Sequence, residues 1–294
     1  MSALPRERIV RFGPDQRLMG ILTTPREPRA GLPHVVLVNA GIVHRVGPNR
    51  MYVDIARSLA ARGFSVLRFD LSGLGDSPAA DTAASLSDAA VADVRAAFDF
   101  LQSTKHATSF IVSGLCLGAN YSFLAAAADH RVTGVAVVDP TVPRTRRGRL
   151  VHLRRRATHL ATLREVVTLR HPIWRRSWSR IREAPVPEFA LDWGDQRSGA
   201  DLATPAPDAA QRALRELIDR GVQLMLVFTG GVNHVYNYRD QLFDLLPGFD
   251  FRGQLRLEYM PETDHAVSDR RSRSTLLDAM VEWATAKFPS SVTA

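Results

Sequence analysis

Two patterns of hydrophobic and polar positions alternate along the chain. Continuous apolar runs, of the kind typical of strands buried on both faces of a parallel sheet, occur at residues 34–41, 64–73, 109–114 and 132–140. Between these runs, apolar residues recur at helical spacing and predict helices over residues 49–62, 85–102 and 119–129. The first 140 residues therefore read as strands and helices in turn.

The same alternation continues near both ends of the chain. Residues 7–13 and 17–25 flank a Gly-Pro-Asp turn and predict an antiparallel hairpin. After residue 205 come a helix over 208–221, a strand over 222–231, a further helix, a strand over 254–265 and a closing helix through Trp283. Strands alternating with helices predict an α/β fold with a doubly wound, mostly parallel sheet.

The alternation is interrupted between residues 141 and 205. This segment is rich in arginine, contains Trp174 and has helical patches without a strand pattern. An excursion between two strands of one sheet indicates a lid or cap. We therefore expect a core formed by residues 1–140 and 206–294, with an Arg-rich helical cap of residues 141–205 inserted between the sixth and seventh strands.

The net charge of +8 is concentrated in the predicted cap. Because no nucleic-acid-binding motif accompanies the basic residues, their clustering does not favour a nucleic-acid partner. No apolar run approaches the roughly 18 residues that a membrane span needs, and no signal peptide is readable. One cysteine cannot form an internal disulfide. These features predict a cytoplasmic protein without a membrane span, and they leave the oligomeric state open.

The single cysteine, Cys116, lies between Gly114 and Gly118, after an apolar strand and before a helix. This arrangement predicts a nucleophile elbow, a tight turn whose small flanking residues let strand and helix approach closely. The helix N-terminus favours a thiolate there. The alternative is a buried structural cysteine. His265 follows the last predicted strand, from where its ring can reach the elbow as a general base.

With these residues in place, the chain resembles the α/β-hydrolase superfamily over nearly its whole length. The matching features are "VNAGI" after the third strand, "DLSGLGDS" after the fourth, the elbow and the Asp-His pair near the end. Residues 39–77 resemble in particular a bacterial subgroup often encoded with polysaccharide-export or natural-product genes. The resemblance implies an oxyanion hole formed by the backbone N–H groups of Leu117 and Ile42.

The third member of the implied catalytic triad is where the chain departs from the family pattern. The family usually has an Asp after the seventh strand, where this chain has Asn233. Asn233 would orient His265 as in papain-like enzymes, because a thiolate–imidazolium pair needs less help from a carboxylate than a serine does. Asp139, at the end of the sixth strand, is the alternative, and Asp240 is a third choice. We expect Asn233 slightly ahead of Asp139.

Residues around these positions are candidates for substrate contacts, namely His44, Arg45, Tyr236 and Trp174. His44 and Arg45 follow the oxyanion strand and face the expected cleft, or else cap the following helix. Tyr236 flanks Asn233, and Trp174 is either a packing anchor of the cap or a substrate contact. No Cys/His cluster has metal-ligand spacing and no phosphate-binding loop occurs, so we expect neither a metal nor a cofactor.

A cysteine nucleophile changes the expected chemistry, because its acyl-enzyme is a thioester that reacts readily with alcohols and amines. The first hypothesis is therefore acyl transfer from a carrier-protein or coenzyme A thioester to an alcohol or amine. Arginines of the cap, among them Arg154, Arg155 and Arg156, would attract the phosphates or the acidic carrier surface. The alternative for these arginines is a solvated helix face.

Two other functions stay open. The second hypothesis keeps the same residues with water as the acceptor, as in a thioesterase, an esterase or a lactone hydrolase, since dienelactone hydrolases of this fold use cysteine. The third is a binding protein with the hydrolase fold that has lost its triad acid.

Overall fold

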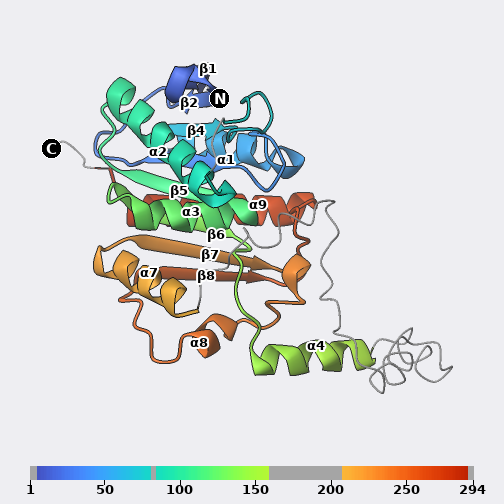
Figure 1. Ribbon diagram of the computed structural model, residues 1–294. Coiled ribbons are helices and arrows are strands. Elements are labelled where there is room, and N and C mark those ends of the chain that lie inside the picture. The colour runs from blue at the N-terminus through green and yellow to red at the C-terminus, as the bar shows by residue number, and fades with distance from the viewer. Residues whose placement is uncertain (1–4, 81–83, 159–206, 291–294) are drawn as a thin grey trace.

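The computed structural model describes residues 5–80, 84–158 and 207–290. Within these residues one sheet has the strand order β1-β2-β4-β3-β5-β6-β7-β8 (Figure 1). The strands are β1 Arg6–Phe12, β2 Leu18–Thr24, β3 His34–Val38, β4 Val66–Phe69, β5 Phe110–Leu115, β6 Val132–Val138, β7 Gln223–Thr229 and β8 Leu255–Met260. β2 pairs antiparallel with β1 and β4, and all the other pairs are parallel. The predicted hairpin and mostly parallel sheet are confirmed.

Helices connect the strands and cover both faces of the sheet. They are α1 Met51–Ala60, α2 Leu86–Lys105, α3 Leu117–Ala128, α4 Arg146–Thr158, α7 Pro207–Asp219, α8 Gln241–Leu245 and α9 Arg270–Lys287. In Figure 1, α2, α3 and α7 lie in front of the sheet and α9 lies behind it. α1 packs against α9 on that second face. None of the helices in the described ranges is both long and apolar enough to cross a membrane.

The two helical layers explain why the strands read as continuous apolar runs. Along β3, Val36 and Val38 belong to the core cluster under α2 and α3. Val35 and Leu37, which point to the other face, belong to the cluster under α1 and α9. Because successive side chains of a strand face opposite sides, a strand covered on both faces needs apolar residues at every position.

The predicted cap is described only at its beginning. α4 starts in this segment and is held against the connection between β7 and α8. Thr145 Oγ1 lies 2.8 Å from the Tyr238 hydroxyl, and Asn237 Nδ2 donates to the Gly148 carbonyl at 2.8 Å. Residues 159–206, with Trp174, lie outside the described residues, so the cap and its boundaries at residues 141 and 205 stay predictions.

The approach of α3 to the end of β3 depends on Gly118. A Cβ atom at Gly118 would lie 2.3 Å from the carbonyl oxygen of Asn39 and 2.7 Å from that of Val38. Both neighbours are backbone atoms at the end of β3, so they cannot rotate away as a side chain would. The start of α3 can therefore approach the end of β3 this closely only with glycine at position 118.

Gly118→Ala tests this packing, because the variant should be less stable than the wild type rather than more stable. Glycine to alanine inside a helix normally gains roughly 1 kcal/mol, whereas the clash with the sheet is expected to lower the free energy of unfolding by about 1–3 kcal/mol. Urea unfolding measures the difference. Gly148→Ala is the control, because its nearest neighbour is the Thr145 hydroxyl at 3.0 Å. A gain in stability for Gly118→Ala would contradict the packing described above.

Candidate active site

Cys116 occupies a sharp turn between β5 and α3. Its backbone has φ 58° and ψ −117°, a conformation that non-glycine residues rarely adopt and that is common at functional sites. A Cβ atom at Gly114 would lie 2.4 Å from the Gly118 carbonyl group. The two glycines that flank Cys116 therefore face each other across the turn. The Cys116 N–H donates to the Val138 carbonyl at 2.9 Å, which fixes the turn to the neighbouring strand.

His265 lies in the loop between β8 and α9 and joins two side chains. Its Nδ1 is 2.7 Å from Asp139 Oδ2, and its ring lies close enough to the Cys116 thiol for the sulfur to affect its pKa. The hydrogen bond to Asp139, followed by the interaction with Cys116, raises the pKa of His265 to about 10, although burial acts in the opposite direction. Near neutral pH the imidazole beside Cys116 is therefore in its protonated form.

Asp139 is held in place by the neighbouring strand β7. Its carboxylate accepts hydrogen bonds from the Thr229 N–H and the Thr229 hydroxyl, each at 2.7 Å, in addition to its contact with His265. The Asp139 side chain is fully buried. Because a buried carboxyl group needs hydrogen-bond partners for its oxygens, these contacts fix its orientation. Asp139 has φ 50°, another strained conformation at this site.

The structure does not bring Asn233 to His265. Asn233 is exposed and ends the short turn Gly230–Val232, where its N–H bonds to the Gly230 carbonyl at 3.1 Å. Among the described residues, the carboxylate at His265 belongs to Asp139, so the expected preference for Asn233 is corrected in favour of the alternative. Asp240 is also remote, as the exposed residue that precedes α8.

The physical reason lies in two glycines that the sequence analysis did not single out. A Cβ atom at Gly230 would lie 1.9 Å from the Pro261 carbonyl oxygen, and one at Gly231 would lie 2.1 Å from the His265 nitrogen. The turn after β7 thus packs against the backbone of the His265 loop, and it leaves the Asn233 side chain exposed. The signal in the sequence is the "TGG" at the end of β7.

The His265 loop is itself rigidly held. Asp264 accepts a hydrogen bond from the Ala266 N–H at 2.8 Å, and the Val267 N–H bonds back to the Asp264 carbonyl at 3.0 Å. Val267 has φ 50° with a fully buried side chain, which is unusual for a β-branched residue. Asn49 Nδ2 also donates to the Ala266 carbonyl at 3.1 Å. These contacts fix the position of the imidazole ring.

The two segments expected to form an oxyanion hole meet at Gly118. Leu117 is the first residue of α3, so its N–H has no acceptor within the helix. Ile42 lies in the turn after β3, which the Val43 N–H to Ala40 carbonyl bond closes at 3.0 Å. The Ile42 side chain is 77% exposed. Since Gly118 packs on the end of β3, this turn lies next to the start of α3.

Arg45 is not placed to bind a substrate. Its guanidinium pairs with Asp70 and lies 2.6 Å from Asp76 Oδ2, while its N–H donates to Asp70 Oδ1 at 2.6 Å. The Asp70 side chain is fully buried and also accepts the Asp76 N–H. Arg45 therefore ties the loop after β3 to the loop after β4, which is a correction to the predicted substrate contact. His44 beside it is exposed, and its predicted role stays open.

Tyr236 is a second correction, because it packs inside the core. Its ring stacks on Phe228 with ring centroids 3.7 Å apart, and its hydroxyl donates to the Arg239 carbonyl at 2.8 Å. The side chain is fully buried. Its neighbour His234 is largely exposed, and partial burial followed by the charges of Arg144, His152 and His265 lowers its pKa.

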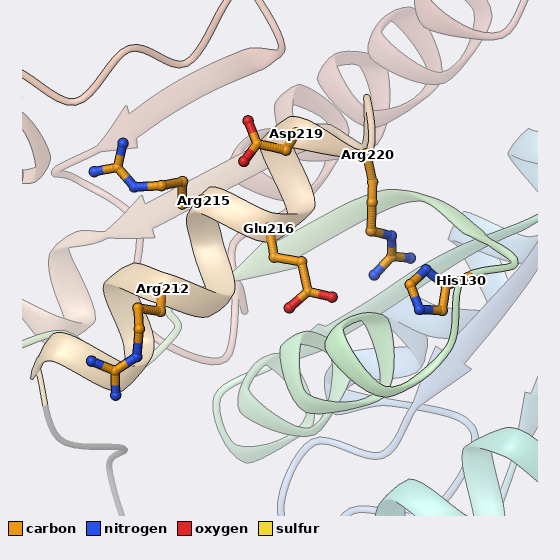
Figure 2. Close-up of a pocket in the computed structure, with 6 residues that line it drawn as sticks. All are labelled: His130, Arg212, Arg215, Glu216, Asp219 and Arg220. Atoms are coloured by element: carbon orange, nitrogen blue, oxygen red, sulfur yellow. The ribbon is translucent and has the colours of Figure 1, made fainter.

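A hollow lies at the end of α3 opposite Cys116, and Arg220 in its lining has a structural role. It lies along α7 and the end of α3 and is lined by His130, Arg212, Arg215, Glu216, Asp219 and Arg220 (Figure 2). Arg220 donates to the carbonyls of Ala126 and Asp129, both at 2.9 Å. Its cation thus caps the negative end of α3, while Cys116 lies at the opposite end. No group of His, Cys, Asp and Glu within the described ranges could hold a metal ion.

Comparisons with known proteins agree with this architecture. Residues 34–183, about half of the chain, match the family described as serine aminopeptidase, S33. An esterase from Pyrococcus furiosus has a similar structure, with a TM-score of 0.60, 12% identity and coverage of 96% of this chain and 92% of the esterase. An α/β serine hydrolase homologue from Coxiella burnetii has a TM-score of 0.55 and 12% identity, with coverage of 94% of this chain and 96% of the homologue.

A third similar structure is a serine hydrolase without a lid from Xanthomonas campestris. Its TM-score is 0.53 and its identity 16%, with 98% of this chain and 96% of the other covered. No curated protein matches the sequence. At these identities the solved structures establish the fold, and the family match covers both Cys116 and Asp139. The chain belongs to the serine aminopeptidase S33 family and has the α/β-hydrolase fold, with cysteine at its elbow.

Proposed function

We propose that the protein is an acyl-transfer enzyme that carries its acyl group as a thioester on Cys116. The observation that carries this proposal is the position of the His265 ring between the buried Asp139 carboxylate and the Cys116 thiol. A nucleophile, a base in hydrogen-bond contact with it and a third group that orients the base are the parts that covalent catalysis requires.

In the first half of the reaction, the Cys116 thiolate attacks the carbonyl carbon of a thioester donor. The C–S bond to Cys116 forms, and the oxyanion accepts hydrogen bonds from the N–H groups of Leu117 and Ile42. The bond to the leaving thiolate then breaks, and this thiolate takes the proton from His265. The products are the acyl-enzyme and a free thiol.

Acylation also prepares His265 for the second half. The interaction with Cys116 contributes to the raised pKa of His265, and this contribution disappears once the sulfur carries an acyl group. The neutral imidazole then accepts the proton of an alcohol or amine as this acceptor attacks the thioester. The C–S bond breaks, the acyl group leaves on the acceptor, and the Cys116 thiolate with protonated His265 is restored. Asp139 keeps Nδ1 as the donor throughout, so that Nε2 faces the reaction.

The donor that we propose is an anionic thioester, such as coenzyme A or a carrier protein with its phosphopantetheine arm. Positive charge near His234 supports this choice, because Arg144 lies close enough to His234 to lower its pKa. Arg154 is exposed further along α4. Arg155 and Arg156 follow on the same helix, but their side chains lie outside the description. Arginines in such positions steer phosphates and acidic surfaces towards a site.

Hydrolysis is the second candidate, with water as the acceptor. The similar structures favour it, since their names describe an esterase and serine hydrolases. The same residues serve both reactions, and the difference lies in whether an alcohol or amine is bound when the thioester opens. The experiment below separates the two.

Acylation of Cys116 is the first test. We expect acetyl- or octanoyl-coenzyme A to add one acyl group to the protein by intact-mass analysis, and Cys116→Ala to abolish the adduct. Addition of a primary alcohol or amine should then give a conjugate faster than free acid. Free acid as the sole product would favour the hydrolase, and a protein that no thioester, ester or thiol-directed reagent modifies at Cys116 would contradict both.

Asp139→Asn tests the assignment of the third residue. Loss of the carboxylate is expected to lower kcat/KM by about 10²- to 10⁴-fold. In addition, the raised pKa of His265 depends first on Asp139, so the alkaline limb of the pH–activity profile should move from about pH 10 towards lower pH. Asn233→Ala is the matched control and should change neither kcat/KM nor the alkaline limb of the profile. Greater loss with Asn233→Ala would restore the assignment made from the sequence.

Charge reversal on α4 tests the donor. The Arg154→Glu, Arg155→Glu, Arg156→Glu variant should raise KM for a carrier-bound donor by about tenfold, because electrostatic complementarity acts mainly on encounter. KM for a short uncharged thioester should stay the same. The Arg6→Glu, Arg8→Glu, Arg11→Glu variant, at exposed positions of β1, makes the same change in net charge and is the control. An equal rise in KM for both donors would argue against carrier binding.

A further inference from the structure

The Tyr52 hydroxyl lies between the two strands that lead into the active site. Tyr52 belongs to α1 and is buried. Its hydroxyl donates to the Val38 carbonyl at 2.8 Å and accepts a hydrogen bond from the Leu115 N–H at 3.1 Å. Val38 is the last residue of β3, and Leu115 is the last residue of β5.

The register of the two strands shows that this hydroxyl lies at the last pair of their ladder. β3 and β5 are parallel, with His34 opposite Phe110 and Val38 opposite Gly114. In a parallel pair, a residue such as His34 donates its N–H to the carbonyl of the residue that precedes its partner on the other strand. Its own carbonyl accepts from the N–H of the residue that follows that partner, and every second residue repeats the pattern. The His34 N–H donates to the Ser109 carbonyl at 3.0 Å.

Continued along the ladder, the same pattern reaches the end of both strands, where it pairs the Leu115 N–H with the Val38 carbonyl. Both of these groups also bond to the Tyr52 hydroxyl. The hydroxyl therefore holds the ends of β3 and β5 at a fixed spacing.

This fixed spacing lies where the chain enters the two halves of the site. Leu115 is followed by Cys116 in the elbow, and Val38 is followed by the turn that carries Ile42. We propose that Tyr52 is a positioning residue whose hydroxyl sets the spacing between the elbow and the oxyanion turn. This inference rests on the proposed function, because it assigns that spacing to the carbonyl group of an acyl donor.

The surroundings of Tyr52 keep the hydroxyl in this bridging role. Burial raises the pKa of Tyr52, so the hydroxyl keeps its proton and can donate and accept at once. The ring is held by the loop before α1, where a Cβ atom at Gly47 would lie 2.7 Å from it and the Tyr52 N–H bonds to the Val46 carbonyl at 3.1 Å. The hydroxyl therefore cannot shift without moving α1.

Tyr52→Phe removes the bridge and leaves the ring. The variant should lower the rate of Cys116 acylation by a thioester about 10- to 100-fold, the size expected when a reacting group is misplaced by about 1 Å. Alkylation of Cys116 by iodoacetamide forms no oxyanion, so its rate should stay within about twofold of the wild-type rate on the same argument. A loss of positioning should lower the acylation rate alone, whereas general damage to the site would lower the acylation and alkylation rates equally. The ratio of the two rates therefore separates these explanations.

Two further measurements complete the experiment. Tyr236→Phe, which removes another buried hydroxyl that bridges an N–H and a carbonyl, calibrates the loss in thermal stability. A crystal structure of Tyr52→Phe should show a changed distance between the Leu115 nitrogen and the Val38 carbonyl oxygen. Equal changes in both rates, or unchanged strand spacing, would overturn the role of Tyr52 alone. A wild-type protein that takes up no acyl group would instead refute the proposed function.

Discussion

The buried Asp139 carboxylate is the interaction on which the site depends. It bonds to the backbone and hydroxyl of Thr229 on one side and to the His265 ring on the other, so it connects β6, β7 and the loop after β8. A carboxylate without these partners would be costly to bury. The strands therefore have to be aligned before the charge is accommodated, and once they are aligned the ring of His265 can point only towards Cys116.

Much of the fold follows from the sequence because each strand contacts helices on both sides. Val35 and Val36 enter different core clusters, which leaves a continuous apolar run that is easy to recognise. The elbow was predictable for a similar reason, since the close approach of Gly114 to Gly118 depends on residues four positions apart. Local chemistry of this kind is visible in a single sequence.

The third residue of the site was not predictable in the same way. The bonds that decide it join Asp139 to Thr229, 90 residues apart in the sequence, and to His265, 126 residues apart. Arg45 was misassigned for a related reason, because its charge looked available for a substrate until the fold brought Asp70 beside it. A long-range partner changes the role of a residue without leaving any trace in the residues around it.

The contact between Gly231 and the backbone of His265 has a consequence for the order in which the protein acquires its chemistry. This contact exists only when β8 has paired with β7, and β8 is both the last strand in the sequence and an edge strand of the sheet. During synthesis, the elbow around Cys116 emerges long before its base does. The thiol therefore remains without its imidazole partner until the C-terminal strand has docked, and a chain that stalls before this point exposes a cysteine that is not yet paired for catalysis.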